Sequence, residues 1–219
     1  MCFSATASFA AAGGLALIGA ATLRERPRPR MAALAATPLI FAAHQGIEGA
    51  IWLQLAAGGP SPALVRIWLL IAESFWPIFV PTAVLLMTRG RRRRQGLVAL
   101  VFTGLVVSAH FLMILIRSDF TVAAVNGNLR YEAAAPPSDR LAGLYLLATV
   151  APLLIARERF VFAFGLAVLG GAIVTELYFR HAGPSVWCFF AAIASLCAFL
   201  AVRDENASRR TFDPPRPGL

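Results

Sequence analysis

Seven apolar runs separated by short polar links dominate the pattern of hydrophobic and polar positions along this chain. A helix that crosses a membrane needs about 20 consecutive residues that are mostly apolar. The pattern therefore predicts an all-α fold, an integral membrane bundle of seven transmembrane helices in residues 1–203, followed by a disordered cytoplasmic tail at 204–219. The predicted helices cover residues 3–23, 33–57, 63–88, 96–116, 141–156, 160–180 and 185–202.

The composition supports lipid as the solvent of this chain. Of its 219 residues, 58% are hydrophobic and only 14% are charged, whereas about a quarter of the residues in a soluble domain are charged. All 20 basic residues are Arg, and the absence of Lys excludes a retinal pigment, because retinal binds through a Schiff-base lysine. The Arg residues lie in the links between apolar runs, so the net charge of +9 does not indicate a nucleic-acid partner.

The distribution of Arg predicts the orientation of the bundle. Fifteen of the 20 Arg residues fall in alternate links or in the tail, and Arg-rich links face the cytoplasm in membrane proteins. The N-terminus is therefore expected outside and the C-terminus in the cytoplasm. The longer external link, from Arg117 to Asp139, is expected to form a lid over the outer face. The cytoplasmic set is Arg24, Arg26, Arg28, Arg30, Arg89, Arg91 to Arg94, Arg157, Arg159, Arg203, Arg209, Arg210 and Arg216.

Ionisable residues within the predicted helices gather in the outer half of the bundle. A charged side chain at the centre of a membrane helix costs about 2.5–3.5 kcal/mol, so its presence calls for an explanation. Glu48 and Glu73 are deep, and neither has a basic partner within a turn of its own helix. Pro77 predicts an irregular third helix close to Glu73. The full set is His44, Glu48, Glu73, His110, Glu176 and His181.

These residue types limit the chemistry that the outer half can support. Imidazole and carboxylate groups bind zinc and other transition metals, which activate water when one coordination position stays open. We therefore interpret the six residues as candidate metal ligands, with Glu48 and Glu73 as candidate catalytic carboxylates. The same set permits a metal-free acid/base pair, a proton relay or a polar ligand pocket. Candidate pocket residues around it are Cys2, Ser4, Trp52, Trp76, Arg180, Trp187 and Cys188.

Structural roles remain open for several of these residues. His44 and His110 are also typical of packed histidines that bond to backbone or hydroxyl groups. Glu176 is placed to pair with Arg180, one turn later on the same helix. The tryptophans suit either a pocket wall or an interfacial belt. The two outer cysteines permit a disulfide between the first and last helices, or a thiolate ligand.

Four motifs of the chain resemble an uncharacterised family of bacterial membrane proteins. They are MCFSATASF at residues 1–9, PLIFAAHQGIEGAIW at 38–52, WPIFVP at 76–81 and SVWCFFAA at 185–192. The likeness spans nearly the whole chain, and the first and last motifs are the most specific. The resemblance implies a multi-pass protein of the bacterial cytoplasmic (inner) membrane, and it implies no particular reaction.

The leading functional expectation is a metal-dependent hydrolase that acts on a lipid or small amphiphile from the outer leaflet. The alternative is a binding or sensing protein that holds a small ligand in the outer pocket. A transporter or proton pathway is less favoured, because no charged residue lines the inner half of the bundle. Each of these functions has the lipid bilayer as its environment, and none specifies an oligomeric state.

Overall fold

The computed structural model describes residues 4–134 and 138–212, without the side chains of His181 and of residues 209–212. It is all-α apart from one small hairpin, so the all-α part of the prediction is confirmed. The helical elements are α1 (Ala5–Arg24), the 3-10 turn η1 (Pro29–Met31), α2 (Ala32–Ala56), α3 (Pro62–Leu69), the π-helical segment η2 (Leu70–Phe75), α4 (Trp76–Met87), α5 (Arg91–Arg117), α6 (Asp139–Ile155), α7 (Arg159–Tyr178), the 3-10 turn η3 (Arg180–Ala182), α8 (Gly183–Ala194) and α9 (Leu196–Phe212).

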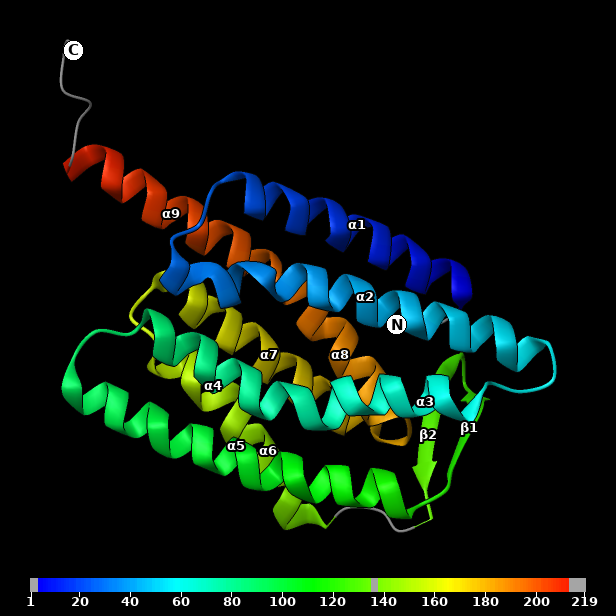
Figure 1. Ribbon diagram of the computed structural model, residues 1–219. Helices are drawn as coiled ribbons and strands as arrows, with labels where there is room; N and C mark the ends of the chain where they lie inside the picture. The colour runs from blue at the N-terminus through cyan, green and yellow to red at the C-terminus, as the bar shows by residue number, and fades with distance from the viewer. Residues whose placement is uncertain (1–3, 135–137, 213–219) are drawn as a thin grey trace.

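In the described part of the chain these elements form seven helical rods that lie side by side (Figure 1). α3, η2 and α4 follow one another without a break as one rod, and α8 and α9 form another with a break at Ser195. α1 packs along α2, α6 packs against α4, α5 and α7, and α9 packs against α1, α2 and α7. The seven rods match the seven predicted apolar runs in number and, within a few residues, in most of their limits.

Within the described residues, five rods are long and apolar enough to cross a membrane. They are residues 5–24, 62–87, 91–117, 159–178 and 183–208. Their outward faces carry large exposed apolar side chains such as Leu17, Phe102 and Ile116, which is the surface that lipid requires. The remaining two rods are α2, with 25 residues, and α6, with 17.

α2 packs against α1, the rod formed by residues 62–87, α8 and α9, and 11 of its 25 residues are buried. The mean hydropathy of α2 is lower than that of the five rods above, because α2 carries polar residues that face other helices. Thr37, His44, Gln45 and Glu48 are all buried. A helix face that packs on other helices has less need of an apolar surface than one that touches lipid.

A two-stranded hairpin covers one end of the bundle. β1 (Phe120–Val125) and β2 (Asn128–Ala133) are antiparallel, and they pack against α3, α8 and η3. The turn is Asn126–Gly127, in which both residues have positive φ, as a two-residue hairpin turn of this kind requires. The long link after α5 thus folds back over one end of the bundle, the position expected for the lid.

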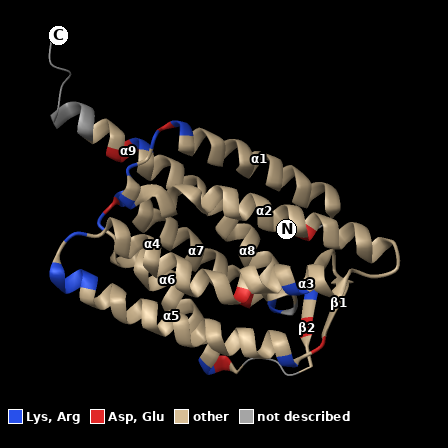
Figure 2. Ribbon diagram, in the orientation of Figure 1, with Lys and Arg blue, Asp and Glu red and all other residues tan. Residues whose placement is uncertain are grey.

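We call the end that the hairpin covers the hairpin end. The opposite end contains the links α1–α2, α4–α5 and α6–α7, and we call it the Arg-rich end (Figure 2).

α9 continues to Phe212, through residues 204–212 of the segment that the sequence predicts as a disordered tail. Polar contacts at the Arg-rich end fix this extension. Arg30 donates to Glu205 at 2.6 Å, Arg159 pairs with Asp204, and Asn206 donates to the carbonyl of Glu25 at 2.7 Å. Residues 213–219 lie outside the described part of the chain.

Candidate functional site

The π-helical segment η2 places Glu73 near the middle of the rod formed by residues 62–87. In a π-helical register the carbonyl of Ala72 would bond the nitrogen of residue 77, but that residue is proline and has no hydrogen. The hydroxyl of Tyr145, from α6, donates to the Ala72 carbonyl instead, at 2.5 Å. The irregular helix predicted from Pro77 is therefore present, and a side chain from another rod replaces the lost hydrogen bond.

Two further carbonyls of the same rod receive side-chain donors. Ser108 of α5 donates through Oγ to the carbonyl of Ser74 at 2.5 Å. Nε2 of His44 lies 3.2 Å from the carbonyl of Trp68, and since a carbonyl only accepts, this nitrogen carries the hydrogen. Side chains from α2, α5 and α6 thus donate to carbonyls of the rod formed by residues 62–87, and His44 is one of these donors. Its other ring nitrogen, Nδ1, is buried and has no hydrogen-bond partner among the described residues.

Glu48 lies one turn after His44 and is also fully buried. The Ser185 hydroxyl donates to its Oε1 at 2.5 Å. Ser185 belongs to the first turn of α8, where backbone N–H groups give the helix end a partial positive charge. This hydrogen bond therefore connects α2 to α8, two helices that are far apart in the sequence.

The hairpin is attached to this region through stacked aromatic rings. The Tyr131 ring of β2 stacks on Trp68, with 4.0 Å between centroids and 6° between planes. Trp68 in turn lies against the His44 ring at 4.7 Å. Leu129 of β2 is fully buried next to them. The hairpin thus contacts Trp68 of α3 directly, and Trp68 connects it to His44 of α2.

A cleft of about 610 Å³ opens between the hairpin, α5 and η2. Glu73 lies in the wall of this cleft and is half-buried. At 1.5 Å per residue, it is about 17 Å from Pro62 along the axis of the rod. The Glu73 carboxylate forms no salt bridge with the residues that the structure describes, although it interacts electrostatically with Tyr145. The lining is otherwise mostly apolar and aromatic, and consists of Leu69, Glu73, Ser74, Phe111, Ile114, Leu115, Asp119, Phe120, Thr121, Tyr131, Glu132, Ala133, Ala134 and Pro184.

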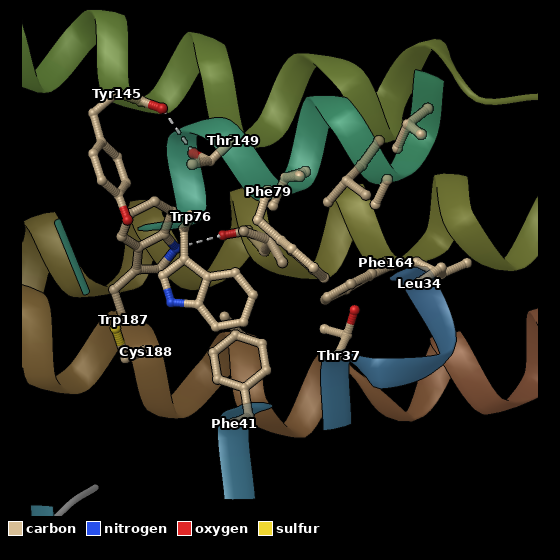
Figure 3. Close-up of a pocket in the computed structure, with 16 residues that line it drawn as sticks. Leu34, Thr37, Phe41, Trp76, Phe79, Tyr145, Thr149, Phe164, Trp187 and Cys188 are labelled. Atoms are coloured by element: carbon tan, nitrogen blue, oxygen red, sulfur yellow. Dashed lines mark hydrogen bonds between the residues drawn. The ribbon is translucent and has the colours of Figure 1, made fainter. Parts of the chain in front are cut away.

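A second, smaller cavity of about 40 Å³ lies inside the bundle and shares no lining residue with the cleft (Figure 3). Trp76 stacks on Phe41 at 4.2 Å beside it, and the Trp187 indole donates to the carbonyl of Val168 at 3.1 Å. Cys188 is buried and lines the same cavity. Its volume is enough for a few water molecules at about 10–15 Å³ each, and not for an amphiphile.

Comparison with family models decides the relationship of this chain to other proteins. A model described as a family of unknown function (DUF6629) matches residues 1–212. The chain belongs to this family. Searches of curated proteins and of solved structures gave no match. Membership in DUF6629 confirms the expected relationship to an uncharacterised family and brings no activity with it.

In this DUF6629 chain, two of the six candidate ligands lie away from the site. His110 is exposed on the outward face of α5. Glu176 is exposed and pairs with Arg180 at 2.9 Å, which is the structural role that their spacing permits. The backbone of His181 is part of η3, and its side chain lies outside the described residues.

The candidate pocket residues also divide. Trp76, Trp187 and Cys188 line the small cavity, and Trp52 packs beside the stacked rings of the hairpin end. Ser4 caps α1, where its hydroxyl accepts from the Ala7 nitrogen at 3.1 Å. Cys2 lies outside the described residues, so its predicted disulfide or ligand role stays a prediction.

The metal-ligand prediction gains no support from the described residues. A catalytic zinc site needs about three protein ligands around one point. Among residues 4–134 and 138–212, no group of three or more His, Cys, Asp or Glu side chains lies close enough to hold a metal ion. His44 and Glu48 share one face of α2, but each bonds to a different rod.

Sequence reasoning missed the side chains that hold the site together, namely Tyr145, Ser185 and Tyr131. Two signals were available for the hairpin and the inner face of α5. Asn126–Gly127 between short apolar segments is a hairpin signal. Gly104 and Ser108 form a small-xxx-small pair, which is typical of a helix face that packs closely on another helix in a membrane. No local signal marks Tyr145, because its partner is 73 residues away in the sequence.

Proposed function

We propose that this chain is a seven-span protein of the bacterial inner membrane, with its N-terminus outside, that binds a small cationic amphiphile in the cleft at the hairpin end. The positive group of the ligand would lie against Glu73, and its apolar part against the aromatic and aliphatic lining. The proposal keeps the binding function that the sequence left as the alternative to hydrolysis.

The positions of α2 and α6 support the seven-span count. Both lie beside the other five rods and are roughly parallel to them (Figure 1). α6 presents exposed apolar side chains at Leu144, Leu147 and Ile155, as a lipid-facing helix does. α2 packs against neighbouring rods along its buried face and exposes Leu53 elsewhere. The Arg-rich end then faces the cytoplasm by the positive-inside rule, and the hairpin end faces outward.

The unpaired carboxylate of Glu73 is the observation that carries the ligand proposal. A carboxylate at this depth without a salt bridge is costly unless it takes up a proton or meets a cation. The described lining of the cleft contains no Arg, and its other carboxylates, Asp119 and Glu132, pair with Arg66 and Arg130 outside the lining. An acidic, partly aromatic cleft favours a cation, and its aromatic rings can attract a cation through their faces.

The experiment uses the full chain in lipid nanodiscs with three probes that each have an eight-carbon chain: octylamine, octyl glucoside and octanoate. Calorimetry is expected to show saturable binding of octylamine, weak binding of the glucoside and no binding of octanoate. Glu73→Gln removes the charge with little change in volume, and it should weaken octylamine about tenfold or more, the effect expected for a lost charge-assisted contact.

Glu132→Gln is the matched control, because Glu132 lines the same cleft but is half-exposed and pairs with Arg130 at 3.1 Å. Its effect is expected to stay within about twofold. Equal binding of octanoate, or unchanged octylamine affinity in a well-folded Glu73→Gln variant, would refute the proposal. Loss of octylamine binding on adding a chelator would favour the metal-dependent site instead.

A further inference from the structure

The short link between α4 and α5 carries the densest positive charge of the described chain. Thr88, Arg89 and Gly90 join the two helices, and α5 begins directly with four consecutive Arg residues. Gly90 has φ of 103°, a conformation that other residues adopt only with strain, so the turn is tight. Figure 2 shows the start of α5 as a continuous basic turn at the Arg-rich end.

Carboxylates neutralise part of the charge in the other links at this end, and none in this one. Glu25, Asp204 and Glu205 form their ion pairs with Arg28, Arg30, Arg159 and Arg203. Within the described residues, Arg89 and Arg91 to Arg94 form no ion pair with any carboxylate. Arg94 has another task, since it donates to the carbonyls of Leu85 and Thr88 at the end of α4.

Arg89, Arg91 and Arg92 are exposed, and they lie close to the lipid-facing surface of α5. The exposed apolar side chains of α5 begin at Val98 and continue with Phe102 and Leu105. Val98 follows Arg92 by about 9 Å along the helix axis at 1.5 Å per residue. Arginine stems can lie along apolar surface while their guanidinium groups reach the headgroup layer.

We infer that the segment Arg89–Arg93 binds the phosphate of an anionic phospholipid headgroup in the leaflet at the Arg-rich end. Guanidinium groups bind phosphate through paired hydrogen bonds, and a basic cluster next to a membrane helix attracts anionic lipid. The nearness of the hydrocarbon-facing residues favours a lipid over a free anion. This inference does not depend on a ligand in the cleft at the hairpin end.

The test measures retention of phosphatidylglycerol against phosphatidylcholine by native mass spectrometry of the full chain released from mixed-lipid nanodiscs. The wild type is expected to retain phosphatidylglycerol selectively, and less of it as the salt concentration rises. The triple variant Arg89→Gln, Arg91→Gln, Arg92→Gln should lose about tenfold or more of this selectivity, since each surface Arg contributes roughly fivefold. The same three residues changed to Lys should keep part of it, since Lys keeps the charge but not the paired hydrogen bonds.

The matched control removes equal charge from the same end, at Arg24→Gln, Arg26→Gln and Arg157→Gln. These residues are exposed; Arg24 ends α1, and Arg26 and Arg157 lie in the other two links. An equal loss of phosphatidylglycerol selectivity in both triple variants would refute a specific site. So would an increase in thermal stability of the wild type that is as large with inorganic phosphate as with phosphatidylglycerol. A photoactivatable phosphatidylglycerol should crosslink the wild type within residues 85–98. Crosslinks confined to other segments would overturn the inference even if the Gln variant failed to fold.

Discussion

Gly104 is the residue on which the close contact between α4 and α5 depends. A Cβ atom at this position would lie 1.9 Å from the Pro77 carbonyl oxygen, and a backbone atom cannot move aside as a flexible side chain can. We expect Gly104→Ala to separate the two helices and to lower the free energy of unfolding by about 1–3 kcal/mol. Thermal unfolding in detergent measures this loss.

Gly96→Ala is the control, because Gly96 lies in the same helix and a Cβ there would meet no atom within 4 Å. It should leave stability unchanged or raise it slightly, since alanine favours the helix more than glycine does. Equal effects of the two substitutions would mean that the contact at Pro77 is not the cause.

The side of a helix on which a polar residue lies decides whether it belongs to a site, and single sequences rarely reveal this. Depth in the bundle was predicted for His44, Glu48 and His110 alike, from the direction of each helix. The structure buries the first two and exposes His110. The buried face of α5 runs through Gly104 and Ser108 and misses His110, because close packing on α4 selects the small residues.

At the level of elements, η2 is the segment whose shape sets the position of Glu73. The donor from Tyr145 replaces the hydrogen bond that Pro77 cannot make. Tyr145→Phe would leave the buried Ala72 carbonyl without a partner, at a cost of about 1–3 kcal/mol. We also expect weaker octylamine binding, because Glu73 directly follows Ala72. Thermal unfolding and calorimetry together check both effects.

Tyr178→Phe provides the same chemical change at a side chain that is 72% exposed. It should alter stability by no more than about 0.5 kcal/mol and leave binding unchanged. Should Tyr145→Phe behave like Tyr178→Phe, the donor to Ala72 would not be what maintains the π-helical register.

The limits of the helices could be predicted from hydropathy because lipid demands an unbroken apolar run. Two elements escaped this argument. The hairpin lies outside the apolar runs, and its signal is a turn, Asn126–Gly127, that a search for spans passes over. The extension of α9 past residue 203 is polar, and its helix is stabilised by tertiary contacts with Glu25, Arg30 and Arg159, which composition alone cannot show.

For the whole molecule, the number of spans and the orientation can be tested together. Between Asp119 and Ser208 the described chain passes through three rods: α6, α7 and the α8–α9 rod. If all three cross the membrane, the two residues lie on opposite sides. If α6 does not cross, they lie on the same side. The side chains of both residues are exposed, so each position accepts a reporter without disturbing the packing.

We expect Asp119→Cys to react with a membrane-impermeant maleimide in intact spheroplasts, and Ser208→Cys to react only after detergent lysis. Both variants would be made in a background with Cys2, Cys188 and Cys197 changed to Ala, and that background alone is the unlabelled control. The expectation follows from the Arg-rich links, which resist translocation and hold Ser208 in the cytoplasm. Labelling of both positions from the same side would rule out α6 as a span. Labelling of Ser208→Cys alone in intact spheroplasts would keep all three of these rods as spans and reverse the orientation, which would place the Glu73 cleft toward the cytoplasm.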